Sequence, residues 1–285
     1  MTERDASRTA MATAYMRAAH QLLDAPPRIL EDPLALAVVG EEGERYIRGG
    51  MDRLQSPEGR ALRAHVVLRS RYAEDRLALA VARGITQYVV LGAGFDTFAL
   101  RQPKWAQALR IFEVDHPGTQ AVKRAKLAAA GLALPANAAF ANIDFEHESL
   151  LDGLRRNGIR PDKPTLFSWL GVTMYLTREA IDAVLASVAR FPAGSEIVLT
   201  FASPPESEGD AGARQGLSAL AAASAAVGEP WLSHFEPAAM EAMLRTAGFA
   251  EIEFLVPEMA DAAYFRQRPP DLPVPRRTTI ASAVR

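Results

Sequence analysis

Val89-Val-Leu-Gly-Ala-Gly-Phe-Asp-Thr97 joins a short apolar run directly to a glycine-containing turn. The run Gln87–Leu91 is apolar and contains β-branched residues, which indicates a buried strand. Gly92 and Gly94 have no Cβ, so the backbone can turn sharply there and come close to a ligand. Open α/β sheets bind ligands at the carboxyl ends of their strands. The stretch therefore predicts an α/β fold with a nucleotide-like ligand at this turn.

The turn matches the dinucleotide-binding fingerprint only in part. The fingerprint G-x-G-x-x-G requires a third glycine at the position where this sequence has Thr97. The chain also lacks a Tyr-x-x-x-Lys pair for proton transfer. An NAD-dependent oxidoreductase is therefore a weaker alternative, and a sharp turn without a ligand is another.

Two acidic residues end the next strand-like run, Leu109–Val114, within Phe112-Glu-Val-Asp-His-Pro117. Asp115 lies 23 residues after Gly92. An acid about 20 residues beyond such a turn can accept hydrogen bonds from both hydroxyls of a ribose. Glu113 and Asp115 face the same side of a strand, so spacing leaves both as candidates. A solvated strand end is the alternative for this pair.

The rest of the central region alternates between strand-like and helix-like segments. Further strands are expected at Ala138–Ile143, Thr165–Leu170 and Glu196–Phe201, and helices at Lys123–Ala130, Glu148–Arg156 and Thr177–Phe191. A short helix also fits between the first two strands. Five strands separated by helix-length segments predict a doubly wound parallel sheet with helices on both faces.

Both ends of the chain extend this unit. The first 85 residues read as helical, with a helix at Thr9–Leu23, a short helix opened by Pro33, and a long helix that starts at Ser56-Pro57 and runs to about Ala82. After the fifth strand come an Ala-rich helix around 218–227, a helix at Pro237–Ala247, and two strand-like runs at Ala250–Val256 and Arg277–Val284. We expect the last two runs to form a hairpin at the sheet edge.

We therefore expect a single α/β domain with a seven-stranded, mostly parallel, Rossmann-like sheet. In this organisation, residues 1–85 form a helical segment that covers the pocket, and residues 86–203 form the ligand-binding core. Residues 204–248 form a helical lid inserted after the fifth strand, and residues 249–285 supply the last strands.

The composition is that of a globular protein whose partners are small molecules or proteins. Of 285 residues, 49% are hydrophobic and 23% charged, and the formal net charge is −2. No strong overall field would draw the chain to nucleic acid or to an anionic membrane. No apolar run has the length of a membrane span and no signal peptide is evident, so we expect a cytoplasmic protein. The sequence leaves the oligomeric state open.

Several classes of chemistry lack their residues. Cysteine is absent, which excludes disulfides, thiolate nucleophiles and cysteine-containing zinc sites. The histidines at 20, 65, 116, 147 and 234 do not form a compact group of ligands, so no metal site is expected. The nucleophile elbow G-x-S-x-G of α/β-hydrolases does not occur either.

Further motifs follow one another along nearly the whole chain. Besides the two described above they are Tyr15-Met-Arg-Ala-Ala-His20, Asp32-Pro33, Arg69-Ser-Arg-Tyr72, Asn142-Ile-Asp-Phe145, Ser168-Trp-Leu-Gly-Val-Thr-Met-Tyr-Leu-Thr177, Gly228-Glu-Pro-Trp231 and Tyr264-Phe265. In this order and spacing, the sequence resembles the leucine carboxyl methyltransferase family of class I S-adenosylmethionine-dependent methyltransferases. The resemblance is to its bacterial branch of small-molecule O-methyltransferases in particular.

The resemblance implies how S-adenosylmethionine, which carries a sulfonium, a carboxylate, a ribose and an adenine, would be bound. Arg69, with Arg17 as a second candidate, would bind the carboxylate, because a guanidinium offers a bidentate fork. Gly92, Ala93, Gly94 and Asp96 would line the methionyl portion, Asp115 with Glu113 nearby would hold the ribose, and Asp144 and Phe145 would bind the adenine. From the residues alone, Arg69 shares a helix with Arg63 and Arg71, and a solvated basic face is the alternative.

The segment after the fourth strand is where the methyl group should face its acceptor. The family usually has a glutamate where this chain has Leu170, so one polar contact to the cofactor is expected to be missing. Trp169, Thr173 and Tyr175 remain as candidates for lining the methyl-transfer site, with a core role as the alternative. His234 is a candidate base on the acceptor side, with a structural role as its alternative.

The resemblance thus implies an S-adenosylmethionine-dependent O-methyltransferase that acts on a carboxylate or hydroxyl of a small molecule. Methyl transfer from sulfur is an in-line displacement, so the protein mainly aligns the reactants and excludes water. A carboxylate acceptor needs no base at neutral pH, whereas a hydroxyl does. Because of Leu170, a non-catalytic S-adenosylmethionine-binding protein is an alternative, and an NAD-dependent oxidoreductase is a less favoured one.

Overall fold

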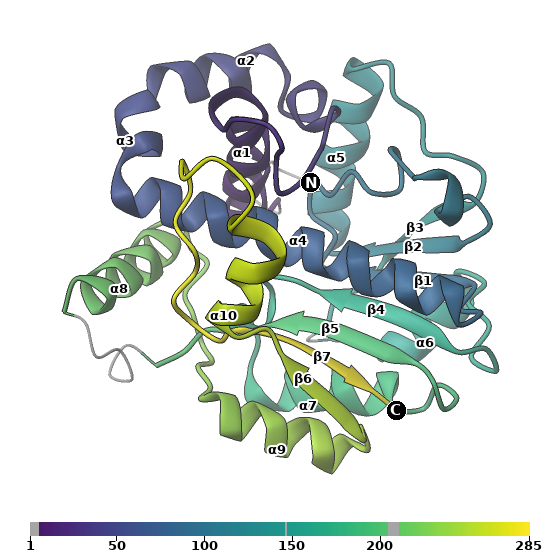
Figure 1. The fold of residues 1–285 in the computed structure, drawn as a ribbon. Coiled ribbons are helices and arrows are strands. Elements are labelled where there is room, and N and C mark those ends of the chain that lie inside the picture. Colours follow the sequence, from purple (N-terminus) through teal and green to yellow (C-terminus); the bar gives the residue numbers. More distant parts are fainter. Residues whose placement is uncertain (1–5, 146, 205–210) are drawn as a thin grey trace.

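Seven strands form one sheet in the order β3-β2-β1-β4-β5-β7-β6 (Figure 1). The strands are β1 (Gln87–Leu91), β2 (Arg110–Asp115), β3 (Ala138–Asn142), β4 (Thr165–Trp169), β5 (Glu196–Thr200), β6 (Glu251–Phe254) and β7 (Ile280–Val284). The first five are parallel, and β7 is antiparallel to both β5 and β6. The expected mostly parallel, seven-stranded sheet is therefore confirmed.

This structure is a computed structural model that describes residues 6–145, 147–204 and 211–285. Its α-helices are α1 (Arg8–Leu23), α2 (Ala35–Gly49), α3 (Met51–Gln55), α4 (Pro57–Ala82), α5 (Pro117–Ala129), α6 (Leu150–Arg156), α7 (Arg178–Val188), α8 (Ala211–Ala226), α9 (Pro237–Ala247) and α10 (Pro257–Ala260). Within the described ranges, no helix has the length and apolar character needed to cross a bilayer.

Capping residues that can be recognised in the sequence begin two of the helices near the site. The Ser56 hydroxyl accepts a hydrogen bond from the Gly59 N–H at 3.1 Å, and Pro57 occupies the first turn of α4. In the same way, the Thr177 hydroxyl accepts from the Ala180 N–H at 3.2 Å at the start of α7. These side chains satisfy backbone donors that the first turn of a helix leaves without partners.

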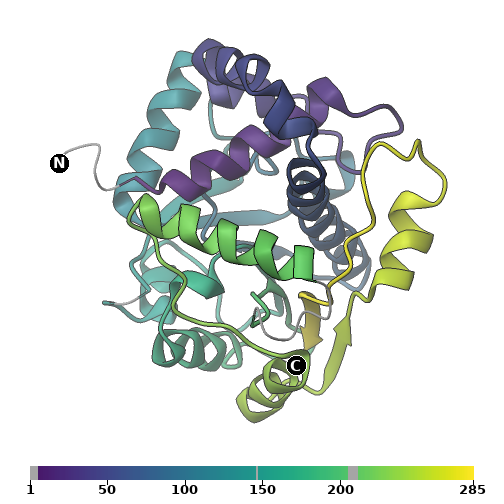
Figure 2. The ribbon, with the colours of Figure 1, turned by 90° about the vertical axis from the view of Figure 1, so that its left-hand side faces the viewer.

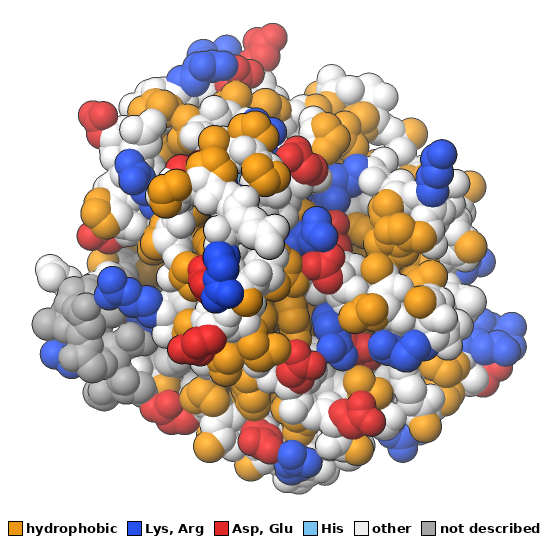
Figure 3. Space-filling model, in the orientation of Figure 1, with side chains coloured by type: hydrophobic (Ala, Val, Ile, Leu, Met, Phe, Trp, Pro, Cys, Tyr) orange, Lys and Arg blue, Asp and Glu red, His pale blue; other side chains and the backbone are white. Residues whose placement is uncertain are grey.

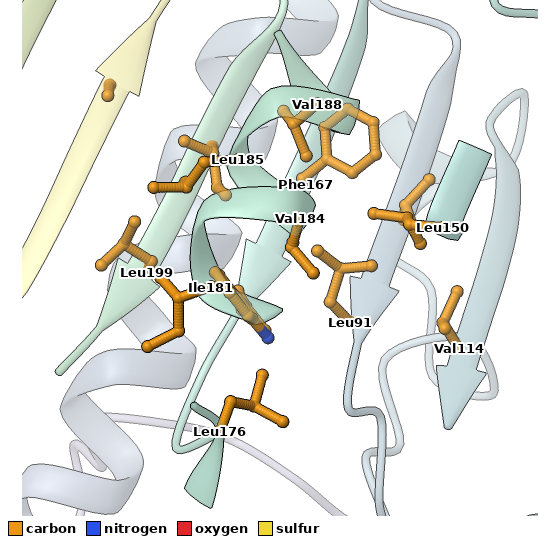
Figure 4. Close-up of a cluster of buried hydrophobic side chains, with 14 of the residues drawn as sticks. Leu91, Val114, Leu150, Phe167, Leu176, Ile181, Val184, Leu185, Val188 and Leu199 are labelled. Atoms are coloured by element: carbon orange, nitrogen blue, oxygen red, sulfur yellow. The ribbon is translucent and has the colours of Figure 1, made fainter. Parts of the chain in front are cut away.

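Helices cover both faces of the sheet (Figure 1). α6, α7 and α9 pack on one face, over a core to which β1, β2, β4 and β5 all contribute. Figure 4 shows Leu91 and Phe167 of two adjacent strands facing Ile181 and Val184 of α7. The C-terminal half of α4 packs on the other face, and α1 packs against both α2 and α4. The N-terminal helices thus lie beside the sheet rather than forming a separate unit.

The chain changes direction across the sheet between β1 and β4. β1 pairs with β2 on one side and with β4 on the other, so Leu91 lies opposite both Val114 and Trp169. Open α/β sheets bind ligands at such switch points. The glycine turn after β1, the acid that ends β2 and the segment after β4 therefore meet at one place.

Two helical segments beside this point differ from the expectations. α5 begins at Pro117 instead of Lys123, because the proline fits a first helical turn and the His116 ring accepts a hydrogen bond from the Gly118 N–H at 3.2 Å. The helix expected between β1 and β2 is a single 3₁₀ turn, Lys104–Ala106. As a result, the glycine turn leads into irregular backbone instead of a helix.

Elsewhere the helical content exceeds the expectation. The helix near Pro33 has 15 residues and a kink at Gly40. The proline-rich connection from β6 to β7 contains α10 and a π-helical turn, Asp261–Phe265. Charges of both signs are interspersed over the face in Figure 3, in keeping with the small net charge.

Candidate functional site

A cavity of about 1770 Å³ lies at the carboxyl ends of β1, β2 and β4. Its lining comes from α1, α4, α8, the glycine turn, the segment after β4 and the segment 270–277. Pockets for one drug-sized ligand typically measure about 300–1,000 Å³. The cavity therefore has room for two ligands side by side.

The glycine turn forms part of the cavity wall. Gly92 has a φ of +67°, and a Cβ added to it would lie 2.2 Å from a methyl carbon of Val172. Only glycine fits this conformation and this approach. The Gly94 N–H donates a hydrogen bond to the Asp115 carboxylate at 2.6 Å, and the Ala93 N–H donates to the Val114 carbonyl at 2.9 Å. The turn is thus held against the end of β2.

Arg69 lies in the cavity wall with its side chain 9% exposed. Its guanidinium lies so close to Gly171 that a Cβ there would be 2.6 Å from both terminal nitrogens. Among the residues that the structure describes, none forms a hydrogen bond or ion pair with this guanidinium. Burial lowers the pKa of Arg69 to about 10, an effect that Tyr175 opposes and Arg17 reinforces. A buried cation in this state strongly favours an anionic ligand.

Arg17 is also buried in the cavity wall, but it is fully engaged by protein carboxylates. It donates to Asp32 at 2.8 Å, to Asp96 and to the Thr97 hydroxyl at 3.1 Å. Burial alone would lower the pKa of Arg17, but Asp96 and Asp32 raise it above its ordinary value. Arg17 therefore braces the turn, and Arg69 is the better partner for a ligand carboxylate.

The two acids of β2 occupy different surroundings. Asp115 lines the cavity, where its carboxylate accepts from the N–H groups of Gly94 and His116 at 2.6 and 2.7 Å. Burial raises the pKa of Asp115, and these two N–H groups oppose the increase. Glu113 is fully buried outside the cavity lining and pairs with Lys123 at 2.5 Å. Burial raises the pKa of Glu113, and Lys123 opposes this.

The adenine-binding candidates lie at the end of β3. Asp144 and Phe145 both line the cavity. The Asp144 carboxylate is 2.9 Å from the Nδ1 atom of His147. The Phe145 ring packs edge-on against the Trp169 ring, with 6.4 Å between the ring centroids. Leu170, with its apolar side chain, also lines the cavity.

The four candidates for the methyl-transfer site differ in whether they line the cavity. Tyr175 lines the cavity. Trp169 is fully buried beneath it, and Thr173 is buried with its hydroxyl donating to the Thr200 carbonyl at 2.8 Å. His234 lies outside the lining, with its ring 5.8 Å from that of Trp231. Of the four, Tyr175 is the one whose placement allows direct contact with a ligand.

Glu229 belongs to the motif Gly228-Glu-Pro-Trp231, but its role could not be predicted from the sequence. Its carboxylate accepts from the Ser7 hydroxyl at 3.0 Å and from the Arg8 N–H at 2.6 Å. The Ser7 N–H in turn donates to the Thr119 hydroxyl at 3.1 Å. The segment after α8 is therefore tied to the start of α1, as Figure 2 shows for the two helices. Two remote parts of the chain meet at the rim of the cavity.

Two kinds of comparison, of sequence and of structure, relate the chain to known proteins. Residues 10–189 match the model of a family described as leucine carboxyl methyltransferase. The chain is 32% identical over 295 residues, covering 95% of each chain, to a Bacillus subtilis protein named provisionally as an S-adenosylmethionine-dependent methyltransferase.

Two solved structures share the fold. One is a protein from Thermobifida fusca described provisionally as a methyltransferase, with a TM-score of 0.61, 18% identity, and coverage of 99% of this chain and 95% of that one. The other is a protein of the DUF574 family from Streptomyces avermitilis, with a TM-score of 0.60, 18% identity, and coverage of 99% and 98%. At this identity they show the fold alone. Because the family model and the full-length relative agree, the chain belongs to the leucine carboxyl methyltransferase family and is a methyltransferase that uses S-adenosylmethionine.

Proposed function

We propose that this methyltransferase methylates an oxygen atom, a carboxylate or a hydroxyl, of a small molecule. The observation that carries the proposal is the cavity of about 1770 Å³, which is lined by the sheet edge, α1, α4, α8 and the segment 270–277. Its volume exceeds what one ligand needs. Walls from so many elements suit a small acceptor that enters beside the cofactor and is shielded from water.

The residues present fit S-adenosylmethionine. The buried Arg69 guanidinium would pair with its carboxylate, and the turn at Gly92 would admit the methionyl chain. Asp115 would accept hydrogen bonds from the ribose hydroxyls, and Asp144 with the Phe145 backbone would contact the adenine. When bound, this cofactor supplies an electrophilic methyl group on a sulfonium sulfur.

The acceptor would occupy the remaining space of the cavity, which Tyr175 also lines. The helices α1 and α4 and the helix α8 would cover it, with the Glu229 contact to α1 holding the cover in place. The protein's contribution to the transfer is then alignment of the acceptor oxygen with the methyl group and exclusion of water.

A dinucleotide fits the same turn poorly. Pyrophosphate groups bind at the N-terminus of a helix that follows such a turn. Here the turn leads to a 3₁₀ segment at Lys104–Ala106, and the Thr97 hydroxyl donates to buried Asp32 at 2.7 Å. An NAD-dependent oxidoreductase is therefore not favoured.

Parallel calorimetric titrations with S-adenosylmethionine, S-adenosylhomocysteine and NAD test the binding half of the proposal. We expect both adenosyl ligands to bind and NAD to give no heat. Transfer of a labelled methyl group from S-adenosylmethionine to a panel of carboxylates, phenols, amines and thiols then tests the chemistry. Methylation confined to amines or thiols would contradict an oxygen acceptor, and binding without any transfer would favour a non-catalytic protein.

A further inference from the structure

His65 lies on α4 one helical turn before Arg69 and lines the same cavity. Residues four positions apart on a helix have Cβ atoms about 5–6 Å apart on one face. His65 is therefore next to the group that would bind the cofactor carboxylate. It is the histidine of the α4 wall, whereas His234 lies outside the lining.

The imidazole of His65 has polar atoms that the described part of the protein does not engage in a hydrogen bond. Burial, together with the positive charges of Arg69 and Arg277, lowers the pKa of His65 to about 3. The ring is therefore neutral at neutral pH, with one N–H donor. A group with so low a pKa is a poor general base, because efficient bases have pKa values near the working pH.

Arg277 approaches the same place from another part of the chain. It lies in the segment 270–277, which lines the cavity just before β7. Its charge is one of the two that act on His65. A neutral N–H donor and a guanidinium that line the same cavity provide a surrounding that stabilises an anionic oxygen.

The same elements also contribute apolar side chains to the cavity. Leu62 and Val66 come from α4, Leu217 and Leu220 from α8, and Val274 from the segment that carries Arg277. These side chains offer an apolar body a favourable place, by removing its surface from water. The cavity thus combines the polar groups of His65 and Arg277 with hydrophobic side chains from the same elements.

We propose that His65 and Arg277 form the subsite for the acceptor oxygen, and that the acceptor is an oxyanion carried on an apolar body. The oxyanion is a carboxylate or an acidic phenol or enol that ionises before transfer. This inference rests on the proposed function. During transfer, a lone pair of the oxyanion forms a bond to the methyl carbon, and the carbon–sulfur bond breaks with its electron pair remaining on sulfur. No proton moves, so His65 acts by hydrogen bonding and remains neutral.

The test measures ligand binding to the protein saturated with S-adenosylhomocysteine, so that it does not depend on turnover. The probes are 2-naphthoate, its neutral isostere 2-naphthamide, and 4-nitrophenol at a pH where it is ionised in solution. In the wild type we expect at least one anion to bind about tenfold more tightly than 2-naphthamide.

His65→Leu and Arg277→Gln should each lower the affinity for that anion about tenfold. His65→Asn, which keeps an N–H donor, should lower the affinity less. Arg266→Gln, outside the cavity lining, is the matched control for charge and should change nothing.

The possible results distinguish an error in the acceptor subsite from an error in the cofactor assignment. Binding of 2-naphthoate alone identifies carboxylates, and binding of 4-nitrophenolate alone identifies acidic hydroxyls. The subsite is wrong if 2-naphthamide binds as tightly as the anions, if none of the three probes binds at millimolar concentration, or if His65→Leu leaves anion binding unchanged. It is also wrong if His65→Leu weakens S-adenosylhomocysteine about tenfold, because His65 then belongs to the cofactor site. Failure of the wild type to bind S-adenosylhomocysteine would instead overturn the proposed function.

Discussion

The carboxylate of Glu229 accepts a hydrogen bond from the backbone N–H of Arg8 at 2.6 Å, although 221 positions separate the two residues. Ser7 and Thr9 donate their hydroxyls to the same carboxylate. The first turn of a helix has N–H groups without partners and a partial positive charge, so a carboxylate is a suitable partner. This contact fixes the start of α1 to the segment after α8 at the rim of the cavity.

Glu229→Gln should accelerate ligand exchange. Loss of the negative charge at the start of α1 removes about 0.3–1 kcal/mol of stabilisation, which corresponds to dissociation of S-adenosylhomocysteine about two- to fivefold faster. Stopped-flow displacement measures this rate. Glu258→Gln, at an exposed position in α10, is the control and should leave the rate unchanged. Equal rates for both variants and the wild type would show that this contact does not limit exchange.

Arg69→Met should have opposite effects on binding and on stability. Affinity for S-adenosylmethionine should fall by more than about tenfold, because the carboxylate loses its charged partner. Without ligand, the variant should be more stable by about 1 kcal/mol, since a buried guanidinium without a protein partner is removed. For a chain of this size that is a rise in Tm of about 2 °C.

Arg71→Met is the matched control on the same helix. Arg71 is half exposed and pairs with Asp75 at 2.9 Å, so neither the affinity nor the Tm should change appreciably. If Arg69→Met lowered both the affinity and the Tm, the guanidinium would have a structural role in the free protein. Calorimetric titration and thermal unfolding of the three proteins separate these cases.

The sheet and much of its surroundings could be predicted because their signals are local. The strand Gln87–Leu91 was expected with the bounds that it has, since an apolar run there ends at a glycine. Pro57 after a serine likewise located the start of α4. The start of α5 was missed, although the same kind of signal was present in His116-Pro117. The expected strand ended at Val114, and the residues between it and Lys123 were not assigned to a helix.

The candidate site could be predicted only as a set of residues. Arg69 and Arg17 were both candidates for the cofactor carboxylate, and they differ in the structure because Asp32 and Asp96 meet Arg17 and not Arg69. This pairing depends on how α1 packs against the glycine turn, and spacing along the chain does not reveal it. The acids of β2 are a similar case, because the packing of α5 on the sheet separates them.

Glu113→Gln and Asp115→Asn should therefore produce different defects. Glu113→Gln leaves the charge of Lys123 buried without its partner, so we expect a loss of about 3–5 kcal/mol in the free energy of unfolding. Asp115→Asn should leave stability near that of the wild type and weaken S-adenosylhomocysteine about tenfold, because the ribose hydroxyls lose an ionised acceptor. Urea unfolding and calorimetry measure the two quantities. The reverse outcome, with Glu113→Gln stable and deficient in binding, would assign the ribose to Glu113.

Asp24 should make the N-terminal helices sensitive to acid. Its carboxylate accepts from Arg63 through two bonds of 2.7 Å and lies 2.7 Å from the Nδ1 atom of His20. Burial alone would raise the pKa of Asp24, but His20 and Arg63 hold it below its ordinary value of 3.8.

The stabilisation of the folded protein by ionised Asp24 is therefore present above pH 3.8 and is lost as the pH falls through the lower pKa of the folded protein. Asp24→Asn should lower the free energy of unfolding at neutral pH by about 3–5 kcal/mol and flatten its decline below about pH 4. Asp162→Asn, which alters an exposed ion pair with Arg160, should leave the wild-type profile unchanged. Parallel profiles for the wild type and Asp24→Asn would mean that the acid sensitivity arises elsewhere in the chain.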